Sequence, residues 1–520
     1  MAGISNALPA SVTINELTTV AAEWALAQFT DATGQIIGAP SSNATGFANA
    51  VNQAQANLAD ISSGGPASFW SSNGVTEASC TGGSPPVNCD GLERMDTIAN
   101  ILAACVESSG PSSSACIALL TNTGSSTFTL AAAHVMATNP VANVAALFAI
   151  QSGSPPFTPD LTETAPDGWE IALNFAPSGA NFDGTNFLAI DAGGNVWVPN
   201  ISGNTVTELT SSGGLAGNFT PSGASFNGPD GVAIDAAGNA WVTNYGFGVD
   251  EEGGTSVTEL LAGCTTSSCT ADNFSNANTS GANFADPIQV AIDAAGNAWV
   301  TNQAGNSVTE LLAGCTASSC TADNFNNSNT EGAGFDLPQF EAIDAAGNVW
   351  VTNALGNSVT ELTSSGGLAG HFDPDGANFD FPGGVAIDAA DNVWVANVDG
   401  DSVTELTSSG GLAGNFDPSG ANFGEPIGVA IDAAGNVWVT NIGGNSVTEL
   451  TSSGALAGHF APSGAHFSAP DGVAIDASGN VWSANAGGDS VAEIVGAARP
   501  VLTPRVACLK QTPAHAVCLP

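Results

Sequence analysis

Positively charged residues are almost absent from this sequence. Its 520 residues include 4 Lys and Arg against 48 Asp and Glu, which gives a formal net charge of −44 at pH 7. Affinity for nucleic acid and for anionic membrane surfaces depends on Lys and Arg, so we expect neither kind of partner. No Lys or Arg lies between residues 95 and 498, and salt bridges therefore cannot hold that stretch together.

Long apolar runs are also absent. No run reaches the roughly 18 residues that cross a bilayer, so we predict no membrane span. The first residues, MAGISNALPAS, lack the charged and apolar segments of a signal peptide. With 43% hydrophobic residues, the chain is nevertheless expected to fold around a core, and its length allows two or more domains.

The ten cysteines fall into five pairs of near neighbours in the sequence. An even number, short spacing and the lack of a nearby histidine cluster favour local disulfides over metal sites. Disulfides predict an oxidising location, which means a secreted, periplasmic or cell-surface protein. The expected pairs are Cys80–Cys89, Cys105–Cys116, Cys264–Cys269, Cys315–Cys320 and Cys508–Cys518.

The first part of the chain, residues 1–153, is predicted to be an all-α domain. Apolar residues recur there at helical spacing, for example Leu17, Val20 and Trp24. A proline-rich linker, residues 154–168, follows it and predicts the domain boundary. The expected helical segments are 13–29, 91–106, 129–140 and 141–153.

Residues 169–494 are built from one repeated unit. Twelve residues of the form AIDAAGNVWVTN occur seven times, and four of the six intervals between copies are 44 residues long. Each unit is interpreted as four strands, GVAID, NVWVTN, SVTELT and LAGNF, which are rich in residues that favour strands. Four strands per unit and a period in the forties predict a β-propeller. The copies begin at Ala189, Ala233, Ala291, Ala342, Ala386, Ala430 and Ala474.

The seventh copy stops at Val495 without a fourth strand. The missing strand matches residues 169–182, WEIALNFAPSGANF, which precede the first copy. We therefore predict an all-β, seven-bladed propeller of four-stranded blades, whose ring is closed by this N-terminal outer strand. Residues 495–520 form a disulfide-looped basic tail that could dock on the acidic body.

The unit P-x-G-V-A-I-D-A-A-G-N-V-W-V-T-N-x-x-G-N-S-V-T-E-L resembles the NHL repeat over about residues 169–494. The resemblance implies the propeller fold. It leaves function open, because similar propellers include protein-binding scaffolds, streptogramin lyases and calcium-dependent lactonase-like hydrolases. Residues 1–153 resemble no family that we recognise.

Three side chains recur in every blade: an Asp that ends the first strand, an Asn that ends the second and a Glu on the third. Catalysis needs one asymmetric site, so a residue present seven times is interpreted as a turn cap or a hydrogen-bonding group between blades. The Asp residues are Asp191, Asp235, Asp293, Asp344, Asp388, Asp432 and Asp476. The Glu residues are Glu208, Glu259, Glu310, Glu361, Glu405, Glu449 and Glu493.

Positions that differ between blades are the candidates for function. The resemblance to lactonase-like propellers implies a partial calcium or magnesium site near the central channel, formed by Asn186, Asp230, Gln339 and Asp471. Glu341 adds a carboxylate where the other blades have Val or Leu. A Glu on an inner strand without Lys or Arg nearby needs either a metal or a proton.

The loop after the second strand of blade two is lengthened to YGFGVDEEGG. It contains Tyr245 and three consecutive acids, Asp250, Glu251 and Glu252. These residues predict a binding loop, and the acids either hold a hard cation or form a solvated surface.

The resemblance to streptogramin lyases implies a site of His and Glu with a divalent metal at the channel mouth. Among the propeller histidines, His371 and His459 share one fourth-strand position where other blades have Asn. Only His466, in the loop between blades six and seven, is placed where it could act.

We predict an exported propeller scaffold that binds a protein or glycan partner through its asymmetric loops, without catalysis. The alternative is a metal-dependent hydrolase or lyase with its site at the channel mouth, where Glu341 or His466 would be catalytic and a divalent cation the cofactor. Such an enzyme needs a cation held by asymmetric acids, whereas a scaffold does not.

Overall fold

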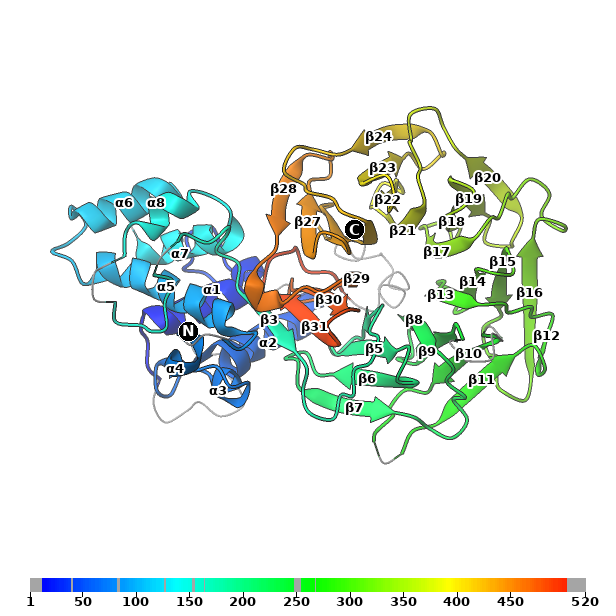
Figure 1. Ribbon diagram of the computed structural model, residues 1–520, viewed down its shortest axis with the longest axis horizontal. Helices are drawn as coiled ribbons and strands as arrows, with labels where there is room; N and C mark the ends of the chain where they lie inside the picture. Colours follow the sequence, from blue (N-terminus) through cyan, green and yellow to red (C-terminus); the bar gives the residue numbers. More distant parts are fainter. Residues whose placement is uncertain are drawn as a thin grey trace.

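Figure 1 shows seven sheets arranged in a ring, with the helices of the N-terminal part gathered at one side of it. The computed structural model describes residues 12–38, 41–81, 85–125, 128–151, 155–162, 164–246, 254–266 and 268–502. The predicted fold class, an all-α region followed by a seven-bladed all-β propeller, is confirmed.

The helical region contains more helices than the sequence predicted. The expected segments correspond to α1, α5, α7 and α8, whereas α2, α3, α4 and α6 were not predicted. None of the helices in the described part of the chain combines the length and apolarity needed to cross a bilayer. The helices are α1 Glu16–Ala25, α2 Ala44–Gln53, α3 Ser68–Ser72, α4 Glu77–Cys80, α5 Cys89–Val106, α6 Ser114–Thr123, α7 Thr129–Thr138 and α8 Val144–Phe148. A short hairpin of β1 Ala59–Asp60 and β2 Gly65–Pro66 lies between α2 and α3.

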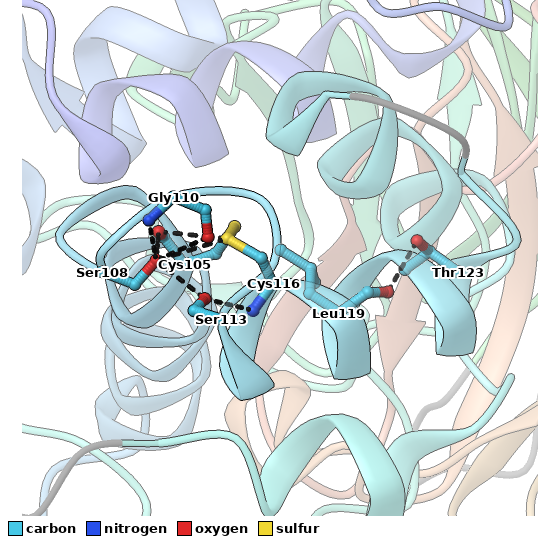
Figure 2. Close-up of a disulfide and its surroundings, with 7 residues drawn as sticks. All are labelled: Cys105, Ser108, Gly110, Ser113, Cys116, Leu119 and Thr123. Carbon is cyan, nitrogen blue, oxygen red and sulfur yellow. Dashed lines mark hydrogen bonds between the residues drawn. A yellow bond between two sulfur atoms is a disulfide. The ribbon is translucent and has the colours of Figure 1, made fainter.

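Two of the predicted disulfides connect these helices. Cys80–Cys89 joins the end of α4 to the start of α5, and Cys105–Cys116 joins the end of α5 to α6 (Figure 2). Beside the second disulfide, Ser113 caps α6, because its Oγ accepts a hydrogen bond from the backbone N–H of Cys116 at 3.2 Å.

In blades one to six, the first four strands from the channel outward follow one another in sequence. Blades one to three contain β4 Ala189–Ile190, β5 Val196–Asn200, β6 Thr205–Leu209 and β7 Leu215–Phe219; β8 Pro229–Ile234, β9 Ala240–Asn244, β10 Ser256–Leu260 and β11 Ala271–Ser275; β13 Pro287–Ile292, β14 Ala298–Asn302, β15 Ser307–Leu311 and β16 Cys320–Asn326. In blade three, β12 Thr279–Ser280 adds a fifth strand parallel to β16. Blades four to six contain β17 Pro338–Ile343, β18 Val349–Asn353, β19 Ser358–Leu362 and β20 Leu368–Phe372; β21 Pro382–Ile387, β22 Val393–Asn397, β23 Ser402–Leu406 and β24 Leu412–Phe416; β25 Pro426–Ile431, β26 Val437–Asn441, β27 Ser446–Leu450 and β28 Leu456–Phe460.

Blade seven closes the ring with a strand from the N-terminal side, as predicted. It consists of β29 Pro470–Ile475, β30 Val481–Asn485, β31 Ser490–Ile494 and β3 Ala172–Phe175. Phe175 of β3 stacks on Trp482 of β30 with ring centroids 5.6 Å apart, and the outer-strand Phe of blade one stacks in the same way on Trp197. The borrowed strand therefore supplies the same core aromatic as the strands of complete blades.

The helical region and blade seven share one hydrophobic core. A single cluster of buried apolar side chains extends from α1 and α5 into β3, β5, β30 and β31. Across this boundary, Trp24 Nε1 donates a hydrogen bond to the carbonyl oxygen of Trp169 at 2.8 Å, and Gln53 Nε2 donates to the carboxylate of Glu493. In blade one, the corresponding Glu208 accepts from an Asn of its own blade. A helical residue thus takes over a hydrogen bond that is otherwise made within a blade.

Arg94 of α5 links the helical region to the segment that enters β3. Its side chain is 4% exposed and forms ion pairs with Asp90 (2.8 Å), Asp167 (2.7 Å) and Glu170 (2.8 Å), and it also donates to the carbonyl oxygen of Gly168. Burial raises the pKa of Glu170 to about 7, although the guanidinium lowers it. Losing the guanidinium would leave buried carboxylates without a counter-charge.

We predict that Arg94→Met lowers the free energy of unfolding by about 3–5 kcal/mol at pH 8, because breaking a buried ion pair leaves an uncompensated charge. Denaturant unfolding followed by tryptophan fluorescence measures the change. Arg499→Met is the matched control, since the Arg499 side chain is exposed and donates to Gln28 at 2.9 Å. Equal effects of the two substitutions would contradict the structural role of Arg94.

Candidate ligand site at the channel mouth

The residues that recur in every blade are structural. In blade one, Asp191 Oδ1 accepts hydrogen bonds from the backbone N–H groups of Gly193 and Asn195, both at 2.8 Å, and its Oδ2 accepts from Trp197 Nε1 at 3.3 Å. Asn195 Nδ2 also donates to Glu208 at 3.0 Å. The other blades repeat most of this set. The prediction of turn capping is confirmed, and these hydrogen bonds lie within blades.

Burial raises the pKa of every recurring Glu, and the recurring Asp of the same blade raises it further. The pKa rises to about 7 for Glu208, Glu259 and Glu310, and to about 8 for Glu449. The remaining recurring Glu residues shift in the same direction for the same causes. The propeller therefore holds several carboxyls that prefer their neutral form near neutral pH.

Three of the predicted site residues meet on consecutive blades. Asn186 precedes the first strand of blade one, Asp230 lies on β8 of blade two and Asp471 on β29 of blade seven. Asn186 Nδ2 donates to Asp230 Oδ1 at 3.0 Å, and the Asn186 carbonyl oxygen accepts from the N–H of Gly472 at 2.7 Å. Asn186 therefore bridges the strand segments that carry the two acids. The first strand of each blade begins at a loop on one face of the ring, and these three residues lie at or just before those starts. We call this group (Asn186, Asp230 and Asp471) the mouth site.

Both carboxyls of the mouth site are buried. Asp230 is 4% and Asp471 is 9% exposed, and Asp471 Oδ1 has no hydrogen-bond partner in the described structure. Burial raises the pKa of Asp230 to about 7, and the hydrogen bond from Asn186 lowers it only in part. Burial and then the charge of Asp230 raise the pKa of Asp471 well above its ordinary value. The two acids therefore oppose ionisation of one another.

A pair of phenylalanines meets between the first strands of blades one and four. Phe187 of blade one and Phe340 of blade four contact edge to face, with ring centroids 5.3 Å apart. At the position equivalent to Phe187 and Phe340, blades two, five, six and seven have Gly. The first strands of neighbouring blades approach one another closely there. For example, a Cβ on Gly428 would lie 2.4 Å from the carbonyl oxygen of Asp471. The pair was not predicted, although the sequence signals it by replacing the repeated Gly with Phe in two blades.

The other predicted channel residues form a separate group on blade four. Glu341 Oε2 accepts a hydrogen bond from Thr301 Oγ1 at 2.8 Å, and the same hydroxyl donates to the carbonyl oxygen of Gln339 at 2.9 Å. Glu341 Oε1 is buried without a partner, and burial raises the Glu341 pKa to about 8. No hydrogen bond in the described structure connects this group to the mouth site.

The described residues include no cluster of three or more His, Cys, Asp or Glu side chains that could hold a metal ion. The five predicted metal ligands are divided between the mouth site and blade four, as described above. A divalent cation at the mouth would therefore have two carboxyls and the Asn186 amide as protein ligands. The metal site stays a prediction.

The histidines of the propeller occupy structural positions. His371 and His459 place Nδ1 3.2 Å from a Thr hydroxyl of the third strand, where Asn415 of blade five donates to the equivalent hydroxyl at 2.9 Å. His466 is exposed and has left-handed backbone geometry (φ 48°), as Asn422 has at the same position of blade five. It follows the short helix η4 Ser463–Ala465, which lies against α5 and β3. Its catalytic role stays a prediction.

Tyr245 is the described part of the predicted binding loop. Its hydroxyl donates to Gln303 Oε1 at 2.8 Å, and its pKa is raised by burial and by the nearby charges of Asp286 and Asp230. Tyr245 therefore lies near the mouth site. The three loop acids, Asp250, Glu251 and Glu252, lie outside the described residues.

Four of the five predicted disulfides are present. Besides the two in the helical region, Cys264–Cys269 and Cys315–Cys320 close small loops before the outermost strands of blades two and three. Cys508 and Cys518 lie outside the described residues. Four disulfides indicate an oxidising location.

These features define a seven-bladed β-propeller of four-stranded blades with an asymmetric polar site. Residues 281–494, which span blades three to seven, match the virginiamycin B lyase family. The predicted lyase-like resemblance is thereby confirmed, and the finer assignment to NHL repeats stays a prediction. No curated protein sequence matches the chain.

Solved structures of lyases share the fold. Virginiamycin B lyase from Staphylococcus aureus is 18% identical, with a TM-score of 0.50 over 62% of this chain and 98% of that one. A streptogramin B lyase structure is 18% identical (TM-score 0.49, 62% and 97%). A catalytically inactive variant of the S. aureus enzyme with quinupristin is 17% identical (TM-score 0.49, 62% and 98%). At this identity the likeness concerns the fold alone.

We predict that the protein is more stable at about pH 5 than at about pH 8. A carboxyl whose folded pKa lies above its unfolded value contributes stability below the unfolded pKa, and this contribution is lost as pH rises through the folded pKa. For Glu449 these values are 4.5 and about 8. Thermal unfolding at both pH values measures the effect.

The variant Glu449→Gln stays neutral and can still accept the hydrogen bond that Asn436 donates at 2.9 Å. We expect it to raise the Tm by several degrees at pH 8 and to leave it unchanged at pH 5. Exposed Glu331→Gln is the control and should change neither value. If Glu449→Gln followed the wild-type pH profile, the burial of this carboxyl would not contribute to the pH dependence.

Proposed function

We propose that the protein is exported and binds a small ligand or a segment of a protein or glycan partner at the mouth of its propeller channel. The observation that carries the proposal is the mouth site itself, the asymmetric group of buried polar side chains on three consecutive blades. Buried polar atoms without partners are costly, so Asp471 Oδ1 is suited to contact a bound molecule. The four disulfides support an extracellular or periplasmic location.

Lyase or hydrolase activity at the same site is the second candidate. The match of residues 281–494 with the virginiamycin B lyase family favours it more directly than it favours a scaffold without catalysis. Two neighbouring carboxyls with raised pKa values can supply a general acid and a general base. The positions of His371, His459 and His466 give less support to catalysis by histidine.

We expect ligands that bind at the mouth to raise the Tm of the wild-type protein and to lose this effect in the double variant Asp230→Asn/Asp471→Asn. Thermal shift with a panel of amines, oligosaccharides and peptides tests this expectation. The control variant Asp323→Asn/Glu331→Gln removes the same two charges from the outer rim of blade three. If every stabilising compound acted equally on both double variants, the ligand site would lie elsewhere.

Incubation with quinupristin and magnesium, followed by liquid chromatography and tandem mass spectrometry, separates binding from lyase activity, because a ring opened by elimination keeps the mass of the intact compound. Binding alone leaves the compound intact. Ring opening that disappears in Asp230→Asn would establish the second candidate, and ring opening that disappears only in His466→Ala would place the catalytic site away from the two acids.

A further inference from the structure

We infer that the group recognised at the channel mouth is an organic ammonium, a positively charged nitrogen that carries alkyl groups. The inference rests on the proposed function and specifies its ligand. It depends on three features of the described structure: the unbalanced acids of the mouth site, the lack of a described Lys or Arg that pairs with them, and the aromatic pair formed by the residues that follow Asn186 and Gln339.

Among the described residues, no Lys or Arg side chain pairs with the two acids. Arg94 and Arg499 are the only Lys or Arg side chains among the described residues. Arg94 is held by three carboxylates at the helical region, and the Arg499 side chain donates to Gln28. The uncharged donor Asn186 satisfies one oxygen of Asp230, whereas Asp471 Oδ1 has no partner. A cation that neutralises this pair therefore comes from outside the described residues, and the ammonium group of a ligand can supply it.

The surroundings favour an organic cation over a metal ion. Calcium takes six to eight oxygen ligands, whereas the described residues contain no group of three or more His, Cys, Asp or Glu side chains arranged to hold a metal ion. An ammonium needs only one or two carboxylates and is also attracted to aromatic rings. Phe187 and Phe340 occupy the positions next to Asn186 and Gln339 and meet across the channel. Alkyl groups on the nitrogen can pack on these rings while the charge faces the acids.

The charge of the whole molecule acts in the same direction. A formal net charge of −44 raises the local concentration of cations and speeds their encounter with an acidic opening. The titratable groups that act on the mouth are Asp230, Asp471, Tyr245 and Asp286. Deprotonation of the two mouth acids strengthens binding of a ligand with constant charge.

Choline is the probe, because its charge does not change with pH. Isothermal titration of the full chain at pH 8 and low salt should show saturable binding of choline and at least about tenfold weaker binding of its neutral isostere 3,3-dimethylbutan-1-ol. Choline affinity should fall by about tenfold or more between pH 8 and pH 5, as the mouth acids become protonated.

Single substitutions locate the site. Asp471→Asn and Asp230→Asn should each weaken choline binding by about tenfold, and Asp323→Asn, which removes one charge from the outer rim, should leave it unchanged. Phe340→Leu should weaken choline more than it weakens the neutral isostere, because only choline interacts with the ring through its charge.

Three results would overturn the inference: no saturable binding of choline, equal binding of the neutral isostere, or equal affinities of the Asp471→Asn and Asp323→Asn variants. A rise in Tm with calcium or magnesium that requires Asp471, together with no choline binding, would assign the mouth to a metal instead. If neutral sugars or peptides raised the Tm and this effect required the two acids, the proposed function would stand and the ammonium ligand would be rejected.

Discussion

The propeller depends on one hydrogen-bonded turn that is repeated in every blade. The Asp that ends the first strand accepts two backbone N–H groups of the next turn and, in most blades, the indole N–H of the second-strand Trp. This arrangement orients the Trp, whose ring stacks on the outer-strand Phe and fills the core between sheets. Because the chain has almost no Lys or Arg, neutral donors satisfy these Asp carboxylates. Burial and the charge of the neighbouring Asp raise the pKa of the nearby Glu.

Blade six shows the limits of this arrangement. There Asp432 Oδ2 accepts the backbone N–H of Arg499, and Trp438 Nε1 is left without a partner. The segment after β31 thus contacts blade six after completing blade seven. Together with Arg94 and the core shared by the helices and β3, this contact ties both ends of the described propeller to neighbouring parts of the molecule. The closing blade is therefore fastened on both sides, which protects the only seam of the ring.

The repeats explain why the sequence predicted so much of the fold and less of the site. The four-stranded repeats and the fourth strand that precedes the first repeat determine the number of blades and the way the ring closes. This prediction succeeds because every blade folds through the same local interactions. The helices α2, α3, α4 and α6 were missed because short segments with few periodic apolar residues depend on tertiary packing. Position within the repeat identified Asp230, Asp471 and Glu341 equally well. The order of the blades around the ring places Asp230 and Asp471 together and Glu341 apart from them, and this order is visible only in the structure. The contact of Phe187 with Phe340 across the channel is likewise visible only in the structure.

The same buried carboxyl has different consequences in a repeated and in an asymmetric position. Glu449 lies against Asp432 and the amide donor of Asn436, and its neutral form is compatible with both. Asp471 lies near Asp230 in one sector of the ring, and one of its oxygens has no donor among the described residues. For Glu449, a proton is sufficient to relieve the cost of burial. For the mouth site a cation can do so as well, because the site lies where the first strands begin and not within the interior of a blade. A proton and a cation therefore compete for Asp471, and ligand binding depends on pH. Binding strengthens as pH rises, whereas the stability of the folded state falls.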